Sequence, residues 1–335
     1  ASANTDGLTV VNTKGDINAT LGGTAEAHID YTVNNSANTG VVNLTATNTG
    51  GLTTTITNDA TAKDGSTSTI TLGNAKSTAT NAVTLNGTVD VVNITGGSGV
   101  DTVAWAGTDV YAGGTINLGG GVDTLDFTNV SALSGASAYT GVAVNLGSQD
   151  KEFVESNTDN NTTVASGTAR SYDDNGTKKL STDGWSFTLN NIEKIIGTAQ
   201  KDYLEANNTG TTFTGAGGAD DIVLGAGSDT VIFSATASNG ADIITSFTAG
   251  ADGDVLNVNA QLGASATVVE APTTGTATGN DADQKVVLLK LASDKETDLD
   301  DAAEVAAFFG STAAETGHYF WLDSDAAGAK EAVIL

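Results

Sequence analysis

The apolar residues in the middle of the chain recur at a fixed interval of nine residues. Between residues 197 and 232 the members of this series are Leu204, Phe213, Ile222 and Val231. Each lies near the end of a nine-residue unit whose first six residues are mostly small or polar. Such a unit predicts a turn followed by a short strand with one side chain pointing inward. Stacked units then form a parallel β-helix in which two units make one coil.

A second regular position holds an aspartate two residues before the inward-facing residue. The unit at 215–223 reads GAGGADDIV and the unit at 224–232 reads LGAGSDTVI, whereas the unit at 206–214 has Thr211 in that position. Units at 96–104 (GGSGVDTVA) and 118–126 (LGGGVDTLD) follow the same pattern upstream. The aspartates in this position are Asp101, Asp123, Asp202, Asp220 and Asp229.

Glycine-rich turns that end in aspartate suit a hard cation. Calcium takes roughly 6 to 8 oxygen ligands at about 2.3 to 2.6 Å, from carboxylates and carbonyls, in a tolerant geometry. Glycine reaches positive φ at little steric cost, so the carbonyl oxygens of such a turn can converge. These turns resemble the repeats-in-toxin (RTX) pattern G-G-x-G-x-D-x-U-x, in which U is apolar, and the resemblance implies that they bind Ca²⁺.

The candidate calcium ligands are the aspartates and the small residues of these turns. Asp202 and Asp220 are two units apart and should share one side of the helix. Asp229 should lie beside Thr211, which lacks a carboxylate and predicts a weaker site. The expected ligands are Asp101, Asp123, Asp202, Asp220, Asp229 and Asp242, with Gly96, Ser98, Gly119, Gly121, Gly197, Ala199, Gly215, Gly217, Gly225 and Gly227.

The segments beside the calcium turns extend the RTX resemblance over about residues 80–260. Residues 141–146 and 187–197 resemble the lead-in to a calcium roll, and the polar segment 149–185 between them is expected to be a surface loop. Residues 239–257 resemble the segment that closes such rolls, where Asp242 and Asp254 are expected as late ligands. The interval from Asp101 to Asp123 is two units plus an insertion of four, and these aspartates are expected to flank another site.

The two ends of the chain follow other patterns. Residues 1–80 contain short alternating strands such as GLTVVN and VVNLT, which predict either a β-solenoid or a β-sandwich. Near the C-terminus, Thr297 is the expected N-cap of a helix that ends at Gly310. After it, YFWL at 319–322 and AVIL at 332–335 predict a hairpin.

Together these patterns predict an all-β protein. The expected fold is a parallel β-roll or β-helix with RTX calcium rolls, an N-terminal β-rich module, and a C-terminal capping helix and hairpin. The expected segments are a β-rich module (1–80), a first calcium β-roll (81–135), a strand segment with a polar insertion (136–196), a second calcium β-roll (197–258), and a cap that by resemblance also holds a type I secretion signal (259–335).

The composition favours a calcium-dependent protein outside the cell. The chain has 40 acidic and 13 basic residues and a formal charge of -27, so a compact state without cations would repel itself. This charge and the lack of Lys/Arg clusters argue against nucleic-acid binding. With no cysteine, calcium would take the stapling role of disulfides. The sequence predicts neither a membrane span nor a Sec-type signal peptide.

No enzymatic motif is found in the sequence. His28 and His318 are the two histidines, so an H-E-x-x-H zinc site cannot form. The nucleophile-elbow pattern G-x-S-x-G does not occur either. The chain is therefore not expected to be an enzyme.

Two functions remain open. The first is the C-terminal part of an RTX-type bacterial surface-layer protein, exported by type I secretion machinery, which folds with Ca²⁺ and associates with copies of itself into a lattice. The second is the calcium-binding secretion and folding module of an RTX adhesin or exoenzyme. An outer-membrane polysaccharide is a further partner that the first interpretation allows. Both place the protein outside the cell or at the bacterial cell surface.

Overall fold

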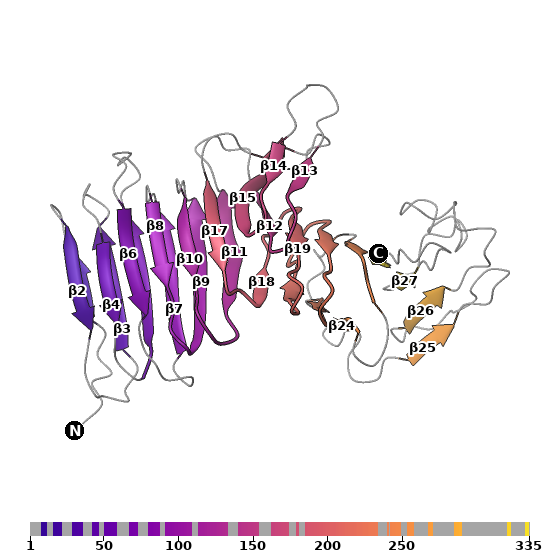
Figure 1. Cartoon of the computed structure of the whole chain (residues 1–335), viewed down its shortest axis with the longest axis horizontal. Coiled ribbons are helices and arrows are strands. Elements are labelled where there is room, and N and C mark those ends of the chain that lie inside the picture. The colour runs from indigo at the N-terminus through magenta and orange to yellow at the C-terminus, as the bar shows by residue number, and fades with distance from the viewer. Residues whose placement is uncertain are drawn as a thin grey trace.

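A computed structural model of the protein contains two long β-sheets, whose strands follow one another along the molecule. In Figure 1 these strands can be followed in chain order from the indigo N-terminal end. The part of the chain that the structure describes contains strands and no helix. No helix in it is long and apolar enough to cross a membrane. The structure describes residues 8–11, 16–21, 29–35, 42–46, 50–58, 67–72, 80–87, 91–108, 113–132, 140–153, 162–173, 179–180, 185–233, 240, 242–248, 253–257, 267–270, 285–289, 320–322 and 332–334.

The first sheet, sheet A, has ten strands, each of which is parallel to its neighbours. In spatial order they are β1 (Leu8–Val11), β3 (Ile29–Asn35), β5 (Leu52–Asn58), β7 (Thr80–Gly87), β9 (Val100–Thr108), β11 (Thr124–Ala132), β18 (Lys194–Ile196), β20 (Thr212–Thr214), β22 (Thr230–Ile232) and β24 (Val255–Asn257).

The second sheet, sheet B, has 16 strands and contains both parallel and antiparallel pairs. In spatial order they are β2 (Ile17–Leu21), β4 (Val42–Ala46), β6 (Thr67–Leu72), β8 (Val91–Thr95), β10 (Gly114–Asn117), β17 (Ser186–Asn190), β15 (Thr168–Asp173), β12 (Gly141–Asn145), β19 (Tyr203–Glu205), β21 (Asp221–Val223), β23 (Ile243–Thr245), β28 (Ala332–Ile334), β27 (Phe320–Leu322), β26 (Lys285–Leu289) and β25 (Thr267–Glu270), with β16 (Lys179–Leu180) beside β15.

Successive strands alternate between the two sheets from β1 to β11 and again from β17 to β24, which is the topology of a parallel β-solenoid. Between residues 194 and 230, Lys194 pairs with Thr212 and Thr212 with Thr230, so one coil takes two nine-residue units, as predicted. The strands of residues 8–72 belong to the same two sheets. Of the two predictions for this segment, the solenoid is therefore confirmed.

The space between the sheets is filled by the alternate side chains that each strand points inward. In β4, for example, Val42, Leu44 and Ala46 are buried while the residues between them are not. Beside the long insertion the core becomes aromatic, and the rings of Trp105 and Phe127 stack with centroids 4.5 Å apart. Burial of these alternating residues is the main stabilising contribution to each coil.

The insertion between β12 and β17 is more structured than the sequence predicted. Instead of a surface loop it contributes β15 to sheet B, antiparallel to its neighbours, and a small separate sheet of β13 (Lys151–Phe153) and β14 (Thr162–Val164). Figure 1 shows β13 and β14 at one edge of the stack. Outward-facing residues of sheet B are buried beneath it in a second core of Ala143, Phe153, Val164, Tyr172, Leu180 and Tyr203.

At the C-terminal end β27 and β28 pair in antiparallel fashion, which confirms the predicted hairpin, and β28 pairs with β23. The predicted helix at 297–310 and the loop at 271–279 lie outside the described residues. The five predicted segments stay a prediction, since both sheets run through several of them and residue 80 lies within β7.

Candidate metal centre

Where the chain passes from sheet B into sheet A, strand register aligns polar residues of successive coils in one column. Strand register pairs Asn81 with Asp101. Thr102 pairs with Thr124, and Thr124 with Lys194, so the residues just before them, Asp101, Asp123 and Glu193, also lie side by side. We call this set the sheet A column. Its members are Asn81, Asp101, Asp123, Glu193, Thr211, Asp229 and Asp254.

Carboxylate oxygens in the sheet A column accept backbone N–H groups of the preceding coil at four places. One carboxylate oxygen of Asp123 accepts the backbone N–H of Asp101 at 2.7 Å, and Glu193 accepts that of Asp123 at 2.9 Å. Further along, Asp229 accepts the N–H of Thr211 at 2.6 Å, and Asp254 accepts that of Asp229 at 2.9 Å. Between these two ladders, the coils of Glu193 and Thr211 are joined by a backbone bond, in which the Thr212 N–H donates to the Glu193 carbonyl oxygen at 2.8 Å.

A second column lies on the opposite edge, where the chain passes from sheet A back into sheet B. It consists of Asp202, Asp220 and Asp242, and we call it the sheet B column. Asp202 accepts the N–H of Val142 at 2.7 Å, Asp220 that of Asp202 at 2.9 Å, and Asp242 that of Asp220 at 3.0 Å. Asp202 and Asp220 thus share one side of the solenoid, as their spacing predicts.

The second carboxylate oxygen separates the turns of Asp101, Asp123, Asp202, Asp220 and Asp229 into two kinds. In the turns of Asp101, Asp202 and Asp229 it accepts the backbone N–H four residues earlier, at 2.9, 2.6 and 2.7 Å respectively. In Asp123 and Asp220 the second oxygen, Oδ2, is buried without a hydrogen-bond partner. Among the described residues of the columns, Asp123 and Asp220 are those with a buried carboxylate oxygen that has no hydrogen-bond partner.

Backbone conformation accounts for this difference. The residue four positions before Asp123 is Gly119, with φ of 86°, and the residue four before Asp220 is Ala216, with φ of 74°. Both lie in the left-handed region, which costs a non-glycine residue such as Ala216 roughly 1 kcal/mol or more. In this conformation neither N–H is donated to the aspartate that follows, and Oδ2 is left for another partner.

Burial strongly disfavours the charge on these carboxyl groups. Burial and the neighbouring charges of Asp202 and Asp242 raise the pKa of Asp220 to about 10. Burial also raises the pKa of Asp123, Asp202 and Asp242 to about 7 in each case. The groups that lower these pKa values are hydrogen-bond donors and not cationic side chains. A bound cation would supply the missing positive charge.

The turn glycines bring backbone carbonyl oxygens against the neighbouring coil. A Cβ atom on Gly119 would lie 2.1 Å from the carbonyl oxygen of Gly97, and one on Gly121 would lie 2.0 Å from that of Gly99. A Cβ atom on Gly215 would lie 2.1 Å from Asp220 Oδ2. Any larger residue would displace these oxygens, so the glycines are required by the close approach of successive turns.

These turns offer the type of oxygen that calcium prefers. The buried Oγ of Ser98, in the coil next to Asp123, also has no hydrogen-bond partner, which adds a third unsatisfied oxygen. Within the described residues no three Asp, Glu or His side chains gather at one point, so a cation here would rely on main-chain carbonyls for most of its ligands. Asp123, Asp220, Ser98 and the carbonyls beside Gly119 and Gly121 fit that role.

The ligands predicted from the sequence lie either in the two columns or in the turns that precede them. All six predicted aspartates lie in the two columns, and Gly96, Gly197 and Gly215 pack directly against the carboxylate that ends their turn. Ser98, Gly119, Gly121, Ala199, Gly217, Gly225 and Gly227 lie in the turns between the strands. Asp229 stands beside Thr211, whose hydroxyl accepts the Asn207 N–H at 3.2 Å in place of a carboxylate.

Sequence reasoning missed two members of the sheet A column. The aspartate position recurs every nine residues, and extending the series back by one unit from Asp202 reaches Glu193. Its unit, TLNNIEKII at 188–196, lacks the glycine-rich turn that marks the other units. Asn81, whose amide donates to Asp101, is in a coil of different length and has no such signal.

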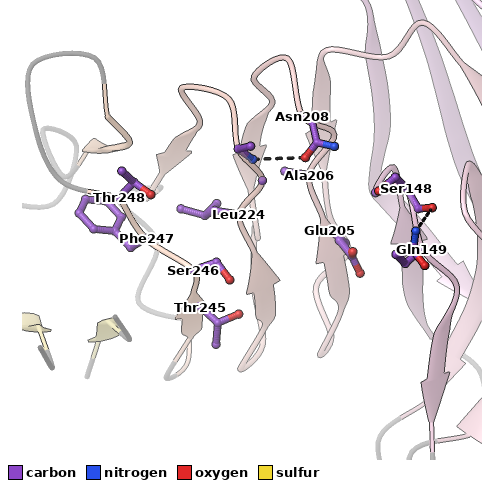
Figure 2. Close-up of a pocket in the computed structure, with 13 residues that line it drawn as sticks. Ser148, Gln149, Glu205, Ala206, Asn208, Leu224, Thr245, Ser246, Phe247 and Thr248 are labelled. Carbon is purple, nitrogen blue, oxygen red and sulfur yellow. Dashed lines mark hydrogen bonds between the residues drawn. The ribbon is translucent and has the colours of Figure 1, made fainter. Parts of the chain in front are cut away.

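A pocket of about 520 Å³ lies where strands β12, β19, β21 and β23 end. Figure 2 shows its wall of turn residues, among them Gln149, Asn208 and Phe247. Among the described residues that line it, Glu205 is the one that is ionisable, and its Oε2 accepts a hydrogen bond from the Tyr203 hydroxyl at 2.5 Å. One carboxyl group without a second acid or base does not make a catalytic pair.

Comparison of the chain with protein-family models found no match, and comparison with curated proteins found none either.

Proposed function

We propose that this chain is a secreted calcium-binding structural protein whose β-solenoid is completed by Ca²⁺ at the turns of the two columns. The observation that carries the proposal is the pair of unsatisfied carboxylate oxygens on Asp123 and Asp220. Each is buried in a column of acidic residues, and burial of uncompensated carboxylates is strongly unfavourable. Calcium would supply charge and coordination at once.

Calcium binding would then control folding. The chain carries a formal charge of -27, and the columns place several of its carboxylates inside the fold. At the low calcium concentration of the cytoplasm these groups would oppose folding and keep the chain in a form suited to export. Outside the cell calcium binds the folded state and stabilises it by mass action.

The experiment that tests this proposal is a calcium titration followed by circular dichroism, with magnesium as the control ion. Calcium at millimolar or lower concentration should raise the β content, whereas magnesium, which demands an octahedral site and dehydrates reluctantly, should not. Equal folding with magnesium or with chelator would contradict the proposal.

Within this function, assembly into a bacterial surface layer after type I export is our first candidate. The support for it is the extended solenoid that continues through residues 8–72, beyond the calcium turns, as expected of a structural rod. The alternative is a calcium-dependent secretion module of an RTX adhesin or exoenzyme. Light scattering and electron microscopy of the calcium-loaded protein distinguish the two, because ordered arrays support the surface layer and a monodisperse monomer supports the module.

A further inference from the structure

The outer face of sheet B carries an unbroken array of threonine and asparagine. Strands β2, β4, β6, β8, β10 and β17 each point two such side chains outward, two residues apart, and none of these is buried. Strand register aligns them in two columns. The first column is Asn18, Asn43, Thr69, Asn93, Thr115 and Thr188, and the second is Thr20, Thr45, Thr71, Thr95, Asn117 and Asn190.

The geometry of this threonine–asparagine array is regular and stiff. The five pairings that join its six strands are parallel and continue without a register shift. In Figure 1 the arrows of β4, β6, β8 and β10 stand nearly parallel. Threonine is restricted at χ1 by its branched Cβ, and Asn43 is fixed by a 3.0 Å hydrogen bond to Asn18. The side chains therefore form a pre-ordered lattice on the surface.

The chemistry of the array excludes most kinds of partner. It holds no basic residue for a phosphate and no aromatic ring on which a sugar could stack. It also lacks the large apolar residues that form the centre of protein interfaces. The outer face of sheet A is less uniform, because Ala104, Asp126 and Lys194 interrupt its threonines. Past β17, the insertion covers sheet B with its own core.

We propose that the threonine–asparagine array binds the surface of ice, that is, a lattice of ordered water. Its repeats are about 4.8 Å between strands and about 6.6 Å between alternate residues of a strand. These distances are of the same order as those between equivalent oxygen atoms on the faces of hexagonal ice. The threonine hydroxyls supply hydrogen bonds to the lattice and their methyl groups fill the spaces between them, while the amide oxygens of Asn18, Asn93 and Asn117 accept hydrogen bonds within the protein and hold these side chains in place.

Such a surface binds through many weak contacts made together. A single hydroxyl gains no free energy when a hydrogen bond to liquid water is replaced by one to ice. A rigid array whose spacing matches the ice surface can form all its hydrogen bonds together, and the weak contributions then add up. Because the side chains are already ordered, little conformational entropy is lost on binding. The array lies largely outside the calcium columns, so this proposal does not depend on the proposed calcium function.

The test measures ice growth with the folded, calcium-loaded protein. Wild-type protein should shape growing ice crystals and slow their recrystallisation. Thr95→Lys and Thr115→Lys place a charge in the middle of the array at exposed positions, and each should weaken the activity by roughly tenfold through loss of simultaneous contacts. Thr163→Lys, at an exposed position in β14 outside the array, is the matched control and should retain full activity.

Circular dichroism of each variant establishes that it is folded, and Thr69→Lys provides a further array variant should one of the others fail to fold. Absence of any effect on ice from folded wild-type protein would overturn the proposal. The same holds if Thr163→Lys reduces the activity as much as Thr95→Lys does. Retention on crystalline cellulose or chitin without an effect on ice would assign the array to a polysaccharide surface instead and would also overturn it.

Discussion

Replacing Asp220 by asparagine separates the two roles that its carboxylate has in the fold. The side chain is 1% exposed, its Oδ1 accepts the Asp202 N–H at 2.9 Å, and its Oδ2 has no partner. Asparagine retains the size of the side chain and the Oδ1 acceptor but cannot carry a negative charge. The substitution therefore preserves the coil-to-coil hydrogen bond and removes the proposed cation ligand.

The size of the effect follows from the pKa of Asp220, which burial and the charges of Asp202 and Asp242 raise from 3.8 to about 10. At pH 7 without calcium the folded protein keeps a proton that the unfolded chain has released. Because the raised pKa exceeds 7, the cost depends on the interval from 3.8 to 7, which is about 4 kcal/mol. Asparagine removes this cost but leaves a buried amide unsatisfied, at about 1 to 3 kcal/mol.

We therefore expect a reversal of sign between two conditions. In chelator, Asp220→Asn should be about 1 to 3 kcal/mol more stable than wild type. In calcium at a thousandfold excess over Kd, wild type gains about 4.1 kcal/mol by binding at one site, which exceeds the variant's advantage, so the variant should be the less stable protein. Urea unfolding followed by the fluorescence of the buried Trp105 and Trp185 measures both differences.

Asp221→Asn is the matched control, because it removes one charge from the adjacent residue. Asp221 lies outside the column and forms an ion pair with Lys201 at 3.4 Å. Its charge adds to the raised pKa of Asp220 and Asp242 but less than burial does, so its loss should change stability by about 1 kcal/mol or less in either condition. Equal destabilisation by Asp220→Asn in calcium and in chelator would refute the reasoning, since it would make Asp220 a purely structural acceptor.

Three further predictions concern the same columns. Without divalent cations, stability should fall by several kcal/mol as pH rises from about 4 to 7, because the native carboxyl groups with pKa values raised to about 7 hold protons that the unfolded chain releases; a rise over this range, in denaturation curves at several pH values, would contradict it. Gly215→Ala should destabilise by at least about 2 kcal/mol because its Cβ would lie 2.1 Å from Asp220 Oδ2, whereas Gly120→Ala, with open space around it, should have little effect on the thermal midpoint. Thr211→Asp adds a buried carboxyl group beside Asp229, so it should lower stability in chelator by on the order of 2 kcal/mol and increase the calcium bound in equilibrium dialysis; unchanged binding would count against a site there.

The regular part of the fold could be predicted from the sequence because its information is local. One inward residue in each unit, and a turn aspartate in most of them, indicate both the strand and its place in the coil, and the pairing of Thr212 with Thr230, two units on, follows directly. Toward the N-terminus the length of the coil varies. More residues separate Leu52 from its partner Asn81 than separate Thr80 from its partner Val100. Apolar residues therefore do not recur at a fixed interval in this part of the sequence.

The insertion could not be predicted because its contacts are distant along the chain. Ala143 pairs with Tyr203, and the chain segment between these two residues contributes β15, which pairs with β12 in antiparallel fashion. The polar composition of 149–185 hides the few apolar residues that matter, such as Phe153 and Leu180, which are 2% exposed. The unsatisfied oxygens of Asp123 and Asp220 could not be predicted from the sequence either, because they depend on the left-handed backbone conformation of Gly119 and Ala216.

The most direct test of the calcium proposal is the anomalous X-ray scattering of crystals grown with calcium. We expect anomalous peaks within about 2.6 Å of Oδ2 of Asp220 and of Asp123, each with several further oxygen ligands from the neighbouring turns. Well-ordered crystals that show both aspartates but no peak beside either of them, at saturating calcium, would contradict the proposal.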